Sequence, residues 1–495
     1  MALSKRYREW NPDQSFLLPP APREWLPEDH LAFFLIDVVR TLDLREIVRE
    51  VQRKDHRGTR PYDPELMVAL LMYGSCVGVL SSRKIELATY ADVAFRVIAA
   101  DQHPDHTALS EFRRRHLKAL GRLFVQTVRL AQKAGLVSLG RVALDGTKVR
   151  ANASKHKAMS YDRMLKSEKE LTREIEELLR LAERTDREED ERYGRDHRGD
   201  EVPEELRRRE SRLKKIQEAK AELEAEAAQA RAVVLEQNAA GQRAQAATTR
   251  DPVEQKRALT RARLAEEQAA KLRGDDDEQP PSAPGTGGGL PHHRVPATPD
   301  GKPTPKAQRN FTDPESRIMK QGQEYMQGYN GQAVVDEKHQ IILASGLSNQ
   351  CPDSEYFEAM IESASKNCGA RPGEVLADNG YWAAANVGYC ERRRIAAYIA
   401  TGRLKHGEPA PTTRGRPPRN LDAKRLMRRK LHTKGGRRAY SRRKVIVEPV
   451  FGQLKSARGL RQFLLRGLDK VRSEWDLWNA GHNLLKLHRA GWQPA

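Results

Sequence analysis

A long segment without β-forming character divides this chain and constrains how it can fold. Over residues 160–273, apolar side chains recur at alternating steps of four and three residues, as in Leu171, Ile175 and Leu178. Glu, Lys, Arg and Ala fill the other positions, a composition typical of a coiled coil. Residues 274–308 then form a Gly/Pro-rich linker with no means of building a core. We therefore expect a coiled-coil insert that interrupts a domain whose strands lie on both sides of it.

The flanking sequence alternates between strand and helix signals. Leaving out the insert, the order is strand, strand, strand, helix, strand, helix, strand, helix, which is the order of an RNase H-like α/β domain. The strands are expected at 141–145, 328–335, 340–347, 374–377 and 395–400, and the helices at 354–367, after Trp382 and from about Ile446.

Three acidic residues occupy useful positions in this order. Asp145 is expected to end the first strand, Asp378 to end the fourth, and Glu448 to begin the final helix. The first and fourth strands are neighbours in such a sheet, so the three carboxylates can converge. Hard divalent cations prefer oxygen ligands. The pattern therefore indicates a two-metal phosphoryl-transfer site.

Each acid also has a structural explanation. Asp145-Gly146 and Asp378-Asn379-Gly380 are turn signals, and Glu448 before Pro449 favours a helix N-terminus. The order of elements around all three favours the catalytic interpretation. Asp353 and Glu374, in the same domain, are expected to take no part.

The region before the first strand is predicted to be helical. Asp63-Pro64-Glu65 is a strong helix start, with a capping carboxylate followed by proline at the first helical position. A later helix begins near Thr107 and contains Arg113 and Arg114. Several short helices with a basic last one suit a helix-turn-helix-like DNA reader, although a plain helical bundle with a basic face has the same spacing.

The charge distribution indicates a polyanionic partner. The chain carries a formal net charge of +20, and residues 401–495 contain 24 Lys and Arg against six Asp and Glu. Nucleic acid is the expected partner of this C-terminal region. The four cysteines form no CxxC pair, and MALSKRYREW has no apolar run. We therefore expect neither a zinc site nor a signal peptide, no membrane partner, and a cytoplasmic, nucleoid-associated location.

Seven separated segments resemble those of insertion-sequence DDE transposases. They occur in the expected order, and the similarity extends to the group with a long insert after the first strand, the IS-eleven-eighty-two group. The segments are RPYDPELMVALLMYGSCVGVLSSRKIE, HPDHTALSEFRRRH, VALDGTKVRANASKHKAMSY, FTDPESRIM, QGYNGQAVVD, LADNGYW and VEPVFGQLK.

The resemblance implies a function and its cofactors. Asp145, Asp378 and Glu448 would be the catalytic, metal-binding acids, holding two Mg²⁺ ions or Mn²⁺ in their place. The substrate would be double-stranded DNA, both the terminal inverted repeats of a mobile element and the target. Hydrolysis at the 3′ ends would be followed by strand transfer. Because two ends must be handled together, we expect a homodimer or a larger assembly.

The signature around the last acid fits only in part. It runs Tyr, Arg, Glu, Lys with two, three and six residues between; Glu448 and Lys455 match, but Ser441 and Lys444 hold the first two positions. Tyr440 and Arg443 stand one residue away.

Residues around the acids are expected to contact DNA. Lys455 would hold a phosphate two helical turns beyond Glu448, with Arg443, Lys444 and Arg458 nearby. Tyr381 would stack on an unpaired base.

The domains expected from the sequence follow these signals. They are a helical DNA-binding domain (1–135), the first catalytic strand (136–159), the coiled-coil insert (160–273), the linker (274–308), the rest of the catalytic domain (309–470) and a C-terminal helix (471–495). Two other functions fit the same sequence. A nuclease of the same fold would cut DNA without strand transfer, and an inactive coiled-coil protein would bind DNA without cutting it.

Overall fold

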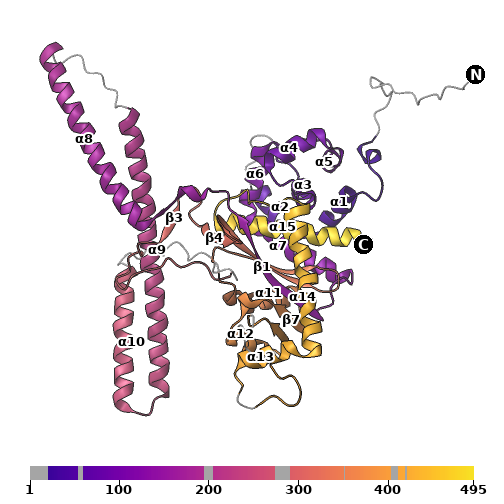
Figure 1. Ribbon diagram of the computed structural model, residues 1–495. Coiled ribbons are helices and arrows are strands. Elements are labelled where there is room, and N and C mark those ends of the chain that lie inside the picture. The colour runs from indigo at the N-terminus through magenta and orange to yellow at the C-terminus, as the bar shows by residue number, and fades with distance from the viewer. Residues whose placement is uncertain are drawn as a thin grey trace, which may run out of the picture. The chain divides into compact units, whose positions relative to one another are not determined.

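The computed structural model divides into two compact units (Figure 1). It describes residues 21–53, 60–193, 204–273, 290–350, 352–402, 411–418 and 421–494. The first unit contains residues 1–127 and 480–495, and the second contains residues 128–479. Residues 274–289 of the segment expected as a linker lie outside the described residues.

The first unit is helical, as expected for the region before the first strand. Asp63 caps α3, since its side chain accepts a hydrogen bond from the backbone N–H of Glu65 at 2.7 Å, and Pro64 takes the first helical position. The helix ends at Gly78, whose φ of 85° suits a residue without a Cβ. The helices that begin in this unit are η1 (Pro22–Trp25), α1 (Leu31–Thr41), α2 (Arg45–Gln52), α3 (Pro64–Val77), α4 (Ser82–Ala91), α5 (Val93–Ile98), α6 (His106–Arg115) and α7 (Leu117–Lys133).

No single described helix is both long and apolar enough to cross a membrane, whereas α3 and α4, bent by 95° at their junction, pass that test of length and composition as a pair.

The second unit is built on a mixed sheet. Its strands are ordered β4-β5-β1-β7-β8, and β6 also pairs with β5. The first and fourth strands of the expected order, β1 and β7, are parallel neighbours, as the sequence indicated. The strands of the unit are β1 (Arg141–Arg150), β2 (Ala158–Ser160), β3 (Gln308–Asn310), β4 (Arg317–Gln321), β5 (Glu324–Asp336), β6 (Ile342–Ser348), β7 (Glu374–Ala377) and β8 (Ala396–Ile399).

Helices follow and cover these strands. The first residues of α15 pack on β5, where Trp475 is fully buried and donates to the carbonyl of Gln332. A Cβ on Gly331 would stand 3.0 Å from this indole, so glycine leaves it room. The helices are η2 (Lys155–Lys157), η3 (Ser354–Tyr356), α11 (Phe357–Cys368), η4 (Asn379–Tyr381), α12 (Ala384–Arg392), α13 (Ala423–His432), α14 (Lys434–Gly452), a π-helical turn η5 (Gln453–Ala457) and α15 (Leu468–Arg489).

Three long helices occupy the insert: α8 (Tyr161–Tyr193), α9 (Glu204–Thr248) and α10 (Pro252–Arg273). Leu171 and Leu223, from the expected apolar seam, are buried where α8 packs on α9. Ala269 is buried where α10 packs farther along α9. Figure 1 shows α8 and α10 extending in opposite directions along α9. The apolar seam therefore lies between packed helices. That these helices form a coiled coil stays a prediction.

Two expected boundaries were wrong. Asp145 does not end the first strand but lies in its middle, because β5 pairs with β1 as far as Arg150. Glu448 does not begin the final helix. It lies near the end of α14, which begins at Lys434 after the cap residue Thr433, and α15 follows.

A proline inside α14 explains why the sequence placed its start too late. Pro449 has no N–H to donate to the carbonyl of Val445, four residues earlier. The side chain of Gln340 satisfies that carbonyl instead, at 3.0 Å. A long-range contact therefore keeps the helix continuous through the proline.

A buried carboxyl in α15 gives the fold a pH dependence. Burial raises the pKa of Asp476 to about 7, against a hydrogen bond from Ser345 and the charge of Arg472, which both lower it. A carboxyl whose pKa is raised by folding contributes its full stability below its pKa in the unfolded chain. That contribution is lost as the pH rises through the folded-state pKa of about 7. We expect Asp476→Asn, which stays neutral, to raise the melting temperature at pH 8 and to leave it unchanged near pH 4. Melting curves of both proteins across this range test the expectation, and an equal difference at both pH values would contradict it.

Candidate active site

The end of the parallel pairing between β1 and β7 brings two aspartates together. The last residues of the parallel pairing are Leu144 and Ala377, and the next residue in each segment is an aspartate, Asp145 in β1 and Asp378 after β7. Residues opposite one another in a ladder point to the same face, so both carboxylates emerge at one edge of the pairing. Each also turns onto a local backbone N–H: Asp145 accepts from Gly146 at 2.9 Å and Asp378 from Gly380 at 2.8 Å.

Arg443 connects this pair of aspartates to the third acid. Its guanidinium donates to Asp145 Oδ2 at 2.6 Å and lies 3.6 Å from Glu448 Oε1. The side chain of Arg443 is only 12% exposed, whereas that of Glu448 is 53% exposed. One buried cation on α14 therefore bridges the strand acid and the helix acid.

The carboxyl of Asp145 sits in an unfavourable place for a negative charge. Burial raises its pKa to about 6; the Arg443 guanidinium opposes this effect, and the negative charge of Asp378 adds to it. Two carboxylates side by side in a partly dehydrated site favour a cation between them. All three acids offer only oxygen donors, which suits a hard divalent ion.

The three acids do not surround a common metal position. Among the described residues, no group of three His, Cys, Asp or Glu side chains is placed to hold a metal ion. Arg443 stands between Asp145 and Glu448 instead. The donor set fits a divalent cation, and the guanidinium supplies the positive charge between two of its members.

A fourth carboxylate, Asp353, also faces the site, although the sequence pattern did not include it among the acids of the site. A Cβ on Gly380 would lie 3.0 Å from Asp378 Oδ1 and 3.1 Å from Asp353 Oδ2, so both oxygens border the same small space. Asp353 Oδ1 accepts hydrogen bonds from Asn330 at 2.8 Å and from Gln332 at 2.9 Å. In the sequence, Asp353 stands directly before the helix expected at 354–367, and only the QGYNGQ segment, which holds both donors, links it to the site.

Tyr381 belongs to the same network and is not a stacking surface. It is fully buried, and its hydroxyl donates to the side-chain oxygen of Gln332. The expectation that Tyr381 stacks on an unpaired base is therefore wrong, because no face of the ring reaches solvent. Its role is to hold Gln332, which holds Asp353.

The remaining expected DNA contacts divide by exposure. Lys444 and Arg114 are exposed, so their expected role is still open to them. Arg113 and Arg458 are buried and donate to the carbonyls of Leu80 at 2.6 Å and Trp478 at 3.0 Å. These two arginines join parts of the fold, and their burial argues against phosphate contacts.

Lys455 is also anchored inside the protein. Its Nζ donates to the carbonyl of Lys148 on β1 at 2.7 Å, and burial lowers its pKa. It lies in the π-helical turn η5 and not on a continuous α-helical face with Glu448. Of the two basic positions beside the signature, Arg443 faces the acids and Lys444 faces solvent.

Two family models match the chain. A model described as a transposase domain (DUF772) matches residues 21–115, and one described as a transposase DDE domain matches residues 412–488. The second match includes Glu448 and Arg443, while Asp145 and Asp378 lie outside both.

The chain therefore carries a transposase DDE domain and a second transposase domain. The search of curated proteins and the search of solved structures gave no match. The transposase domains make this an enzyme that acts on DNA. They also confirm the family that the seven sequence segments indicated, and the group with the long insert stays a prediction.

Gly146 leaves room for the hydrogen-bond network that holds Asp353. A Cβ there would stand 2.4 Å from Gln332 Nε2 and 3.2 Å from Asn330 Oδ1. We expect Gly146→Ala to cost about 1–3 kcal/mol of stability, since the amide must move and lose its hydrogen bonds. Denaturant unfolding measures the loss. Gly140→Ala is the control, because its Cβ would meet nothing closer than 3.9 Å; equal stabilities of the two variants would contradict the expectation.

Proposed function

We propose that this transposase cleaves the 3′ ends of a mobile DNA element and transfers them to target DNA, using an RNase H-like domain. The observation that carries the proposal is the pairing of Asp145 and Asp378 at the end of the β1–β7 ladder, with Arg443 reaching them from the helix that holds Glu448. The parallel β1–β7 pair, flanked by the antiparallel β5 and β6, supports the choice of fold.

Asp145, Asp378 and Glu448 would hold Mg²⁺, or Mn²⁺ in its place. Bound divalent cations supply charge stabilisation for an in-line displacement at phosphorus. The chain itself needs no nucleophilic side chain, since water attacks in cleavage and the freed DNA 3′-hydroxyl attacks in strand transfer. Glu448 is half-exposed and lies 3.6 Å from Arg443, so its carboxylate is accessible from solvent beside the aspartates.

The protein holds the acids in place through groups that do not touch the reacting atoms. Asn330 and Gln332 fix one oxygen of Asp353 and leave the other toward Asp378. Lys455 fixes the turn after α14 to β1. These contacts set the positions of the strand acids and the helix acid relative to one another, which positional catalysis requires.

The other parts of the chain receive roles by the same proposal. The helical first unit would recognise the inverted repeats, and the basic region after 401 would follow the DNA backbone. The insert helices would act in the assembly of a dimer or larger complex that handles two element ends.

Amide variants of the three acids test the proposal. We expect Asp145→Asn, Asp378→Asn and Glu448→Gln to bind an element end within a few-fold of wild type. Each should lose cleavage and strand transfer by about a thousandfold or more, because metal stabilisation contributes several kcal/mol. Gel analysis of a labelled end with Mg²⁺ measures both steps.

Glu374→Gln is the matched control for these variants. Glu374 lies on β7 as well, but it pairs with Arg141 at 2.6 Å at the opposite end of the strand. It should keep near wild-type cleavage. An acid whose amide variant also cuts normally would not belong to the site, and cleavage without joined products would favour a nuclease.

Asp353 should act as a positioning residue. We expect Asp353→Asn to lower the affinity of the site for Mg²⁺ about 10–100-fold, as is usual for groups that orient metal ligands. The readout besides activity is the rise in melting temperature on adding Mn²⁺, which should shrink in Asp353→Asn and not in Glu374→Gln. A wild-type response to Mn²⁺ in the Asp353 variant would limit this residue to a role in folding.

A further inference from the structure

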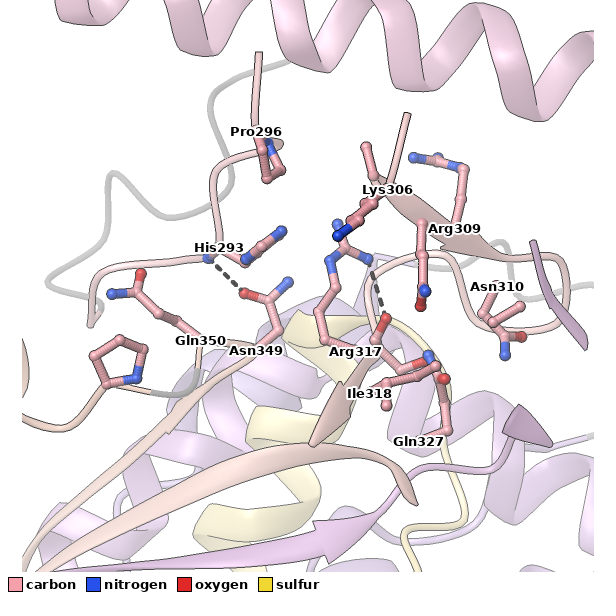
Figure 2. Close-up of a pocket in the computed structure, with 15 residues that line it drawn as sticks. His293, Pro296, Lys306, Arg309, Asn310, Arg317, Ile318, Gln327, Asn349 and Gln350 are labelled. Carbon is pink, nitrogen blue, oxygen red and sulfur yellow. Dashed lines mark hydrogen bonds between the residues drawn. The ribbon is translucent and has the colours of Figure 1, made fainter. Parts of the chain in front are cut away.

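A pocket of about 290 Å³ lies between β3 and the start of β4, beside the insert helix α9 (Figure 2). Three cationic residues line it, Lys306, Arg309 and Arg317, and no Asp or Glu is among its lining residues. The rest of its polar wall consists largely of amide side chains and includes His293. Such a wall offers hydrogen-bond donors and positive charge, a combination that suits an oxyanion.

The two arginines are fixed in place by different partners. Arg309 is held from behind by Glu226 at 2.6 Å and by Glu222, both on α9. Arg317 donates to the carbonyl of Ser316 at 3.0 Å, and its nearest carboxylate is that of Glu226 at 3.8 Å. The Nε atoms of both arginines are buried without a hydrogen-bond partner in the described structure. Each arginine therefore keeps one buried N–H group without a partner.

Lys306 completes the cationic wall. Figure 2 shows the ends of Lys306 and Arg317 directed toward one another across the pocket, with the ring of His293 beside them. Burial lowers the pKa of His293 to about 4, so its ring is neutral near pH 7 and adds no charge. Lys306 is exposed and makes no ion pair within the part of the chain that the structure describes.

The pocket adjoins the site of the acids. Gln350 and Pro352 line the pocket, and Asp353 is the next residue along the chain. Asn330 links the two places, since its amide donates to the carbonyl of Gln350 at 3.3 Å and to Asp353 Oδ1 at 2.8 Å. A strand of DNA that crosses the acids therefore has this pocket next to it.

We propose that the pocket binds a backbone phosphate of the DNA strand that is cut at the acids. This inference rests on the proposed function and adds to it a second contact point on the same strand. Lysine and arginine side chains that meet phosphates fix the register of DNA on a protein. The pocket also gives a purpose to the FTDPESRIM segment: Asp313 anchors it to Tyr329 at 2.9 Å, and Arg317 enters the pocket.

Lys306→Gln in the full-length protein tests the inference. The probe is a fluorescein-labelled 30-base-pair duplex of arbitrary sequence, titrated at several salt concentrations in EDTA and followed by anisotropy. Removing one phosphate contact should make the slope of log K against log salt shallower by about 0.9. Lys302→Gln is the control, because Lys302 is exposed, carries the same charge and does not line the pocket; its slope should match wild type. Equal slopes for the two variants would overturn the inference.

A second measurement identifies the source of the phosphate. If the pocket binds only a phosphate of the DNA backbone, inorganic phosphate should change the melting temperatures of wild type and Lys306→Gln equally. Stabilisation by free phosphate that Lys306→Gln abolishes, with an unchanged DNA slope, would assign the pocket to a free anion and overturn the proposal. Binding is measured in EDTA, where no cleavage occurs, so the two proposals can fail separately. If Lys306→Gln gives the shallower salt slope but the wild-type protein does not cut DNA in Mg²⁺, only the proposed catalytic function is contradicted.

Discussion

The β1–β7 ladder places two negative charges side by side, and other contacts in the second unit offset the repulsion between them. Parallel pairing stops at Leu144 and Ala377, so Asp145 and Asp378 emerge together at one edge. Burial and the neighbouring charge hold the pKa of Asp145 near 6. A cation stabilises the charged form of such a carboxyl, and Arg443 supplies one through a 2.6 Å ion pair.

Helix α14 must therefore be held in a fixed position against the sheet. Thr433 starts it, Gln340 replaces the hydrogen bond that Pro449 removes, and Lys455 ties the following turn to β1. On the other side of the acids, Gln332 carries Asp353 and accepts the hydroxyl of Tyr381. Buried polar networks of this sort specify one arrangement because an unpaired member is costly.

Sequence reasoning found what depends on local signals. The strand at 374–377 and the β5–β6 hairpin appear where period and turn residues placed them, and Asp63 caps its helix. Sequence-based prediction failed where contacts between distant residues determine the end of an element or the burial of a side chain. Asp145 looked like a strand end because a glycine follows it, yet β5 extends the strand by pairing beyond that point.

The same limit explains the errors at the site itself. Tyr381 looked accessible beside a turn, but its burial depends on Gln332, 49 positions earlier in the chain. Arg443 and Lys444 are adjacent, and only the packing of α14 decides which one faces the acids. Asp353 stands directly before the helix expected at 354–367, a position that gives no sign of its partners, because they come from β5.

A cation site where β1, β7 and α14 meet can be tested without following the reaction on DNA. Fe²⁺ bound in place of Mg²⁺, with ascorbate and peroxide, generates radicals that cut the protein backbone next to the ion. We expect fragments that end near residues 145, 378 and 448, that excess Mg²⁺ suppresses and that the Asp378→Asn variant does not give. Cuts that cluster elsewhere, or that persist unchanged in that variant, would contradict this placement of the cation.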